Sequence, residues 1–115
     1  TAVFFEETGY EGGATGTVVV IYNEQVDVTN GATLVVRNTT DSANITATAA
    51  AQTSTNRVEF TFTAAATGKA HAIQAQTISG TIVDSTGGAT SDKAFVAGDV
   101  VGAGGSGSTK TFTAS

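Results

Sequence analysis

Apolar and polar residues alternate with a period of two along much of this chain, which is the pattern of a β-strand with one buried face. The clearest run covers residues 57–63, whose one valine and two phenylalanines all fall on the same face. A second run covers residues 43–49, where an isoleucine and two alanines share a face. The polar residues 53–56 lie between the two runs, so the pattern predicts a hairpin that turns there.

Other segments carry strand signals of different kinds. Residues 17–22 are apolar on both faces, which predicts a fully covered central strand. Asn30 and Gly31 lie between two β-rich runs, and this dipeptide supplies the positive φ angles of a tight hairpin turn. Further strands are predicted over residues 25–28, 33–37, 69–77, 81–83 and 91–97. Short strands at this spacing, without a helical period, predict a single all-β antiparallel sandwich.

Glycine-rich segments flank the predicted sandwich core, which covers residues 17–97. Residues 1–16 form an N-terminal arm with its linker, and residues 98–115 form a linker followed by a strand-like C-terminal arm. A glycine-rich linker behaves as a flexible coil. Each arm therefore either docks on a neighbouring molecule, adds a strand to its own sheet, or is disordered. The chain has no proline, so its sheet edges need other protection, such as pairing with another chain.

The composition and charge of the chain indicate which class of partner it suits. The chain has 22 threonines, whose β-branched side chains favour strands, and only 13% of its residues are charged. The net charge is −5, which argues against binding to nucleic acid. Residues 1–27 hold five acidic and no basic residues, so the net charge comes from this N-terminal quarter. That distribution suits docking on a basic protein surface.

Few residues offer reactive chemistry. The chain has no cysteine and one histidine, His71, so a catalytic triad or a histidine metal site would depend on that residue alone. Its place in an alternating strand favours a structural or surface histidine. Asp84 and Asp92 flank one predicted hairpin, where turn geometry is favoured over calcium binding. We therefore predict no catalytic residue, no metal and no cofactor, and a protein that is not an enzyme.

The sequence carries few signals that indicate a cellular location. The longest aliphatic run, residues 18–21, is too short for a membrane helix, so no membrane insertion is expected. The first residues do not read as a signal peptide, although one removed earlier stays possible. The two sequons at Asn38 and Asn44 matter only for a protein secreted by a glycosylating host.

Residues 57–97 resemble the last three strands of an immunoglobulin-like domain. The resemblance rests on residues 58–62, on residues 68–75, and on the hairpin of residues 82–91 with its Asp84-Ser85-Thr86-Gly87 turn. Bacterial and bacteriophage Ig-like modules are similar in placing a β-run, an Asp-x-x-Gly turn and a Thr/Ser-rich return strand here. The chain departs from many such domains in lacking a cysteine pair and a core tryptophan. The resemblance implies an Ig-like β-sandwich.

Small Ig-like sandwiches with extended arms are similar to the decoration, or cement, proteins of bacteriophage heads. This resemblance implies a structural virion protein on the capsid surface, a homo-oligomer on the particle, with the major capsid protein or sister subunits as partners. The residues expected to bind the partner are Val3, Phe4, Phe5, Glu6, Glu7, Tyr10 and Phe112.

Two other functions stay open at this point. One is a secreted cell-surface or pilus-like subunit that assembles by strand exchange. The other is a carbohydrate-binding module of a fibre, for which Tyr10 and Tyr22 are the candidate aromatic platforms.

Overall fold

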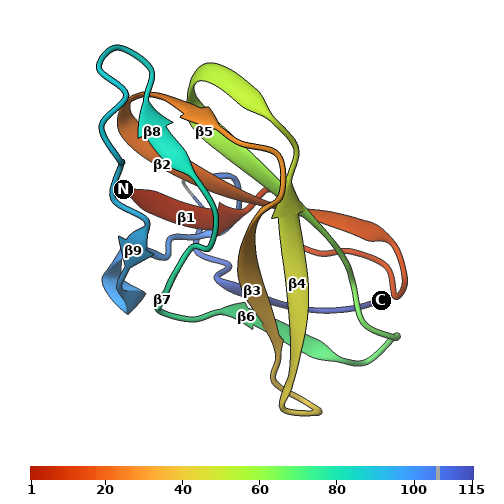
Figure 1. Cartoon of the computed structure of the whole chain (residues 1–115). Coiled ribbons are helices and arrows are strands. Elements are labelled where there is room, and N and C mark those ends of the chain that lie inside the picture. Colours follow the sequence, from red (N-terminus) through yellow and green to blue (C-terminus); the bar gives the residue numbers. More distant parts are fainter. Residues whose placement is uncertain (106) are drawn as a thin grey trace.

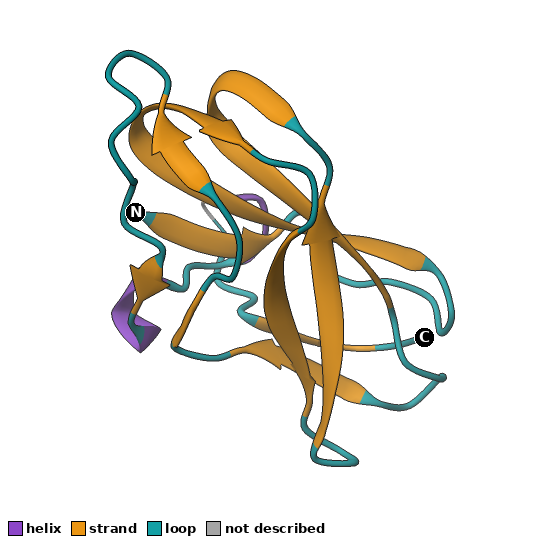
Figure 2. Ribbon diagram, in the orientation of Figure 1, coloured by secondary structure: helices purple, strands orange, loops and turns teal. Residues whose placement is uncertain are grey.

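The computed structural model describes residues 1–105 and 107–115 of the chain. It is all-β, as predicted, and its named strands all pair antiparallel (Figures 1 and 2). The strands are β1 (Ala2–Phe5), β2 (Thr15–Val28), β3 (Ala32–Asn38), β4 (Ala43–Ala49), β5 (Gln52–Thr63), β6 (Ala70–Ile73), β7 (Gln76–Thr77), β8 (Ile82–Asp84), β9 (Ala94–Phe95) and β10 (Thr111–Thr113). Two short 3-10 turns, Ala97–Asp99 and Ala103–Gly105, precede β10.

The main sheet runs in the order β1-β2-β5-β4-β3-β6-β10, and β8 pairs with β2 away from this path. β7 and β9 form a separate two-stranded sheet. The main sheet curls, so that its first and last strands meet: the rings of Phe5 on β1 and Phe112 on β10 have centroids 4.9 Å apart. The apolar core lies inside this curl. The immunoglobulin-like topology stays a prediction.

The central part of β2 is covered on both faces, as its apolar sequence predicts. Val18, Val19 and Val20 are all fully buried. Val18 and Val20 point into the main core, whereas Val19 lies on the other face beside its partner Phe4 of β1. The backbone of Gly105 lies against the Phe4 ring on that second face. Residues 103–105 thus act as a cover for β1 and β2.

Two of the predicted turns differ in the structure. Gly31 has a φ of 96° and turns the chain, but the strands that it joins do not pair with each other. Residues 53–56 belong to β5 and do not form the turn of a hairpin. β5 bends back there, because the side-chain amide of Gln52 bonds both the backbone N–H and the backbone C=O of Glu59.

The strands of the C-terminal half are shorter than predicted. The segment 69–77 divides into β6 and β7, and of residues 91–97 only Ala94–Phe95 pair as a strand. Phe95 is buried, as predicted. The polar turn before Ala89 is present, since the backbone N–H of Asp84 donates to the carbonyl of Ala89.

The glycine-rich segments are packed and do not form flexible linkers along the described residues. Gly16 lies inside β2, directly against the ring of Phe62, where a Cβ atom would have no room. Gly102 lies equally close to the backbone of Gly107. Close backbone approach requires glycine as much as flexibility does, so glycine content alone does not identify a linker. Ser106, within the predicted C-terminal linker, lies outside the described residues.

Candidate functional site: the terminal strands and a threonine-lined cleft

The predicted arms are parts of the chain's own sheet. β1 pairs with β2, and β10 pairs with β6. Of the alternatives that the sequence left open, the structure therefore has the one in which each arm adds a strand to its own sheet. The predicted partner-binding residues divide into buried and exposed ones: Val3, Phe4, Phe5, Tyr10 and Phe112 are buried, and Glu6 and Glu7 are exposed. The apolar five can meet a partner only if a terminal strand detaches.

The structure brings both ends of the chain together in one aromatic cluster. The rings of Phe5, Tyr10, Phe62 and Phe112 lie with centroids 4.9 to 6.5 Å apart, and most of the pairs are edge-on or tilted. Such pairs contribute about 0.5–1.5 kcal/mol each beyond the burial of their area. The cluster therefore fastens β1 and β10 to the centre of the molecule.

His71 completes this cluster as a structural histidine. It is fully buried on β6, and its ring stacks on Phe112 with centroids 4.2 Å apart and planes 7° from parallel. The backbone N–H of Ala65 donates to His71 Nε2 over 3.0 Å, so this nitrogen must be unprotonated. Burial lowers the pKa of the imidazole. The histidine is thus held in its neutral form by packing and one hydrogen bond.

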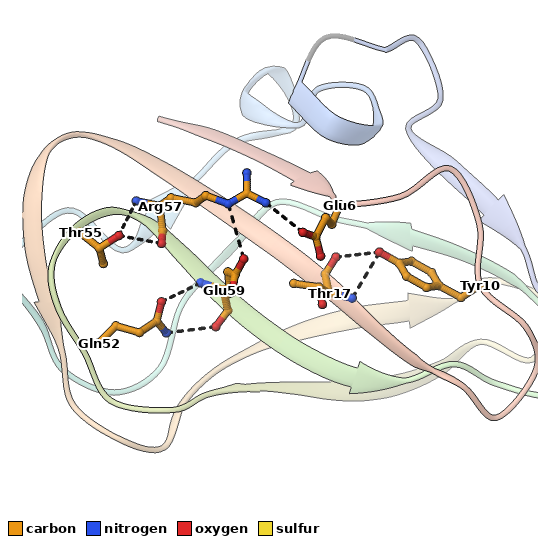
Figure 3. A network of polar contacts seen from close by, with 7 residues as sticks. All are labelled: Glu6, Tyr10, Thr17, Gln52, Thr55, Arg57 and Glu59. Carbon is orange, nitrogen blue, oxygen red and sulfur yellow. Dashed lines mark hydrogen bonds and ion pairs between the residues drawn. The ribbon is translucent and has the colours of Figure 1, made fainter.

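A polar network ties residues 6–10 to β2 and β5 (Figure 3). The Tyr10 hydroxyl donates to the carbonyl of Thr17 over 3.1 Å and accepts from the Thr17 N–H over 3.3 Å. It also accepts from the backbone N–H of Glu7. Tyr10 is therefore positioned by its polar tip as well as by the aromatic cluster.

Arg57 of β5 holds the other side of this network. Its guanidinium lies 3.2 Å from a carboxylate oxygen of Glu6 and 3.5 Å from one of Glu59, and it covers the ring of Phe4 at 5.9 Å (Figure 3). These ion pairs are exposed, so each contributes little stability. Glu6 is thus paired within the chain.

The two aspartates weighed for calcium serve turn geometry. Asp84 accepts the backbone N–H of Thr86 over 2.8 Å, and Asp92 accepts that of Ala94 over 3.0 Å. The described residues contain no group of three or more His, Asp or Glu side chains that could hold a metal ion. Nearby Tyr22 is buried, and burial together with the charge of Asp92 raises its pKa to about 12.

The sequon asparagines lie on the β3–β4 hairpin in different surroundings. Asn38 is buried, and its side-chain oxygen accepts the backbone N–H groups of Thr40 and Asp41. Asn44 is exposed and accepts a hydrogen bond from Arg37 over 2.6 Å. Only Asn44 presents its side chain at the surface.

The outer face of the main sheet carries a row of threonines that the sequence reading missed. Thr17 pairs with Thr61, Thr61 with Thr48, and Thr48 with Thr33, across β2, β5, β4 and β3. Neighbouring strands in a sheet lie about 4.7–4.9 Å apart, so the side chains form a regular line. We call these four residues the threonine face. Each of the four threonines lies between two buried residues of its own strand.

A hollow of about 250 Å³ opens beside the threonine face. It lies between β4 and β5, which pair at Thr48 and Thr61 and diverge beyond that pair. We call this hollow the β4–β5 cleft. Its lining residues are Thr15, Thr46, Thr48, Thr61, Phe62 and Thr63. None of them is charged. The sequence does carry a signal for it, since Thr-x-Thr occurs at residues 15–17, 46–48 and 61–63.

Comparison with protein-family models, with curated proteins and with solved structures finds no match to this chain. Neither of the short helical turns in residues 1–105 and 107–115 has the length or apolarity needed to cross a membrane.

Proposed function

We propose that this chain is a non-catalytic structural module that assembles with other proteins through its threonine face. The observation that carries the proposal is the uncharged row of Thr17, Thr61, Thr48 and Thr33 across four paired strands. Charged residues flank this row: Glu59 precedes Thr61 on β5, and Arg37 follows Thr33 on β3.

Threonine suits such an interface for two physical reasons. Its β-branched side chain has little rotamer freedom on a strand, so ordering it at an interface costs little entropy. Its methyl group buries apolar area, while its hydroxyl both donates and accepts hydrogen bonds. A flat array of these groups therefore packs against a neighbour without burying an unpaired charge.

The more specific proposal is a capsid decoration subunit of a virion, with the major capsid protein or sister subunits as its partner. It is supported by the resemblance to Ig-like decoration proteins and by the low charge of the chain. Exposed acidic residues suit docking on a basic shell, among them Glu7, Glu11 and Glu24. Weak contacts of this kind add up when many copies bind one particle.

The two alternative functions lose support from the placement of their key residues. A sugar-binding platform needs an exposed aromatic ring, but Tyr10 is 8% and Tyr22 is 5% exposed. Strand exchange needs a terminal strand to leave its place, but β1 and β10 both enter the aromatic cluster. We therefore favour docking through a preformed face.

Sedimentation of native material that contains the chain tests the proposal. The chain is expected to travel with an assembly far larger than its own 11.4 kDa. Thr48→Lys places a charge in the centre of the threonine face and should release the chain from the assembly. Thr86→Lys, on an exposed turn, is the matched control and should stay bound. A wild-type chain that sediments only as a free monomer would show the proposal to be wrong.

A further inference from the structure

The backbone of β4 has one edge without a strand partner in the β4–β5 cleft. On the side of β3 away from β4, the backbone N–H and C=O of Thr33 form hydrogen bonds with the backbone of Ser79. The same backbone groups of Val35 form hydrogen bonds with the side-chain amide of Gln76. The intervening β3 residues must then bond β4, through Ala47 and Ile45. By alternation, the N–H and C=O groups of Asn44 and Thr46 point toward β5. Among the described residues, Thr48 is the one β4 residue that pairs with β5.

The facing edge of β5 is open in the same way. Ala64 exchanges backbone hydrogen bonds with residues 13 and 14 ahead of β2, so its neighbour Thr63 directs its N–H and C=O away from β2 and toward β4. Thr63 has no pairing with β4 among the described residues. Two strand edges with unpaired backbone groups therefore face each other across a hollow lined by threonine side chains.

We infer that the β4–β5 cleft is a docking site for an extended, uncharged segment of another polypeptide chain, which pairs with β4 as an added strand. Alternating N–H and C=O groups along a strand edge recognise the backbone of an extended peptide and no other common ligand. This inference rests on the proposed assembly function and names the kind of partner segment involved.

The cleft differs from the other sheet edges, which are protected. The backbone of β1 is covered by Val101, whose N–H donates to the carbonyl of Val3 over 2.9 Å. At Val35, the side-chain amide of Gln76 takes the place of a neighbouring strand, because it bonds both the backbone N–H and the backbone C=O of this β3 residue. Lys110 lies next to the edge of β10, and a lysine there discourages pairing. By contrast, β4 has no charged residue over Ala43–Ala49.

The lining determines the chemistry of the occupant. The lining offers threonine hydroxyl and methyl groups from five residues, together with part of Phe62. A charged side chain placed here would find no opposite charge among the lining residues and would lose its hydration. Small or β-branched residues, such as Thr, Ser, Ala and Val, fit best.

A peptide titration tests the inference on the full chain. The probe is an acetylated and amidated peptide with the uncharged sequence Ala-Asn-Ile-Thr-Ala-Thr-Ala, and amide chemical shifts of the ¹⁵N-labelled chain are measured. Saturable shifts are expected at Asn44, Thr46 and Thr63. Thr46→Pro removes an outward N–H and should weaken binding about tenfold or more. Thr113→Pro, on β10 and outside the β4–β5 cleft, is the matched control and should bind like the wild type.

Several results would overturn the inference. These are shifts elsewhere in the chain, equal binding by Thr46→Pro, or equal binding of a peptide of the same length with alternating Lys and Glu. Concentration-dependent shifts of the same amides without peptide would assign the cleft to a second copy instead. If the chain sediments with its assembly but the peptide does not bind, the proposed function stands and the cleft inference is wrong.

Discussion

The hydroxyl of Tyr22 is buried and has no hydrogen-bond partner in the part of the chain that the structure describes. A buried polar group without a partner loses its hydration and gains nothing in return. Its raised pKa has the same main cause, since burial disfavours the charged phenolate. The hydroxyl of Tyr22 therefore destabilises the folded state, while the ring of the same side chain contributes to the core.

Tyr22→Phe is expected to stabilise the protein by about 1 kcal/mol, because it removes the unpaired hydroxyl and keeps the ring. The free energy of unfolding in urea measures the effect. Tyr10→Phe is the control: it removes a hydroxyl that makes three hydrogen bonds, and it should destabilise the protein by about 1–3 kcal/mol. A loss of stability in Tyr22→Phe would mean that the hydroxyl has a partner.

His71 should make stability depend on pH below about 6.5. Burial lowers its pKa in the folded state below the ordinary value of about 6.5, so the unfolded chain binds the proton more readily. The stability that comes from neutral His71 is therefore complete above this value and falls as the pH drops toward the folded pKa. The slope can reach about 1.4 kcal/mol per pH unit.

Urea unfolding between about pH 7 and pH 5 measures this dependence. His71→Phe keeps a ring against Phe112 but cannot accept the Ala65 N–H. This variant should be less stable at neutral pH and should lose the histidine contribution to the slope. If its slope over this range equals that of the wild type, other groups cause the pH dependence.

At the scale of elements, β2 and β5 are paired so closely that one position requires glycine. Gly16→Ala would place a Cβ against the ring of Phe62, which is itself held by Phe5 and Tyr10 and has no room to move. Overpacking of this kind costs about 1–3 kcal/mol. Gly87→Ala, at an open turn position, should change the free energy of unfolding by less than about 1 kcal/mol. Equal stability of the two variants would contradict this role of Gly16.

The sequence predicts strands well and pairing poorly, for a physical reason. A period of two records which face of a strand is buried, and it correctly located the strands at 43–49 and 57–63. It does not record which strand lies alongside. The Asn30-Gly31 turn therefore suggested a hairpin, although β2 and β3 have other partners. The threonine face was missed for the same reason, since it depends on the register of four strands.

At the scale of the whole molecule, composition misled on the two ends. Glycine-rich segments are equally compatible with a flexible linker and with tightly packed backbone, and only the tertiary structure distinguishes them. Here Gly16 and Gly102 are both packed, and the segments beyond them enter the sheet. The residues expected to bind a partner are largely those that close the core, so the candidate site moves to the outer face.

The meeting of the two ends also sets the order of events during synthesis. The aromatic cluster joins Phe5, near the start of the chain, to Phe112, near the end of the described residues. A nascent chain cannot complete this cluster until Phe112 has left the ribosome. Contacts between residues so far apart in sequence also slow folding. We therefore expect the sheet to close only after this last strand is synthesised, with β6 left as an unpaired edge until then.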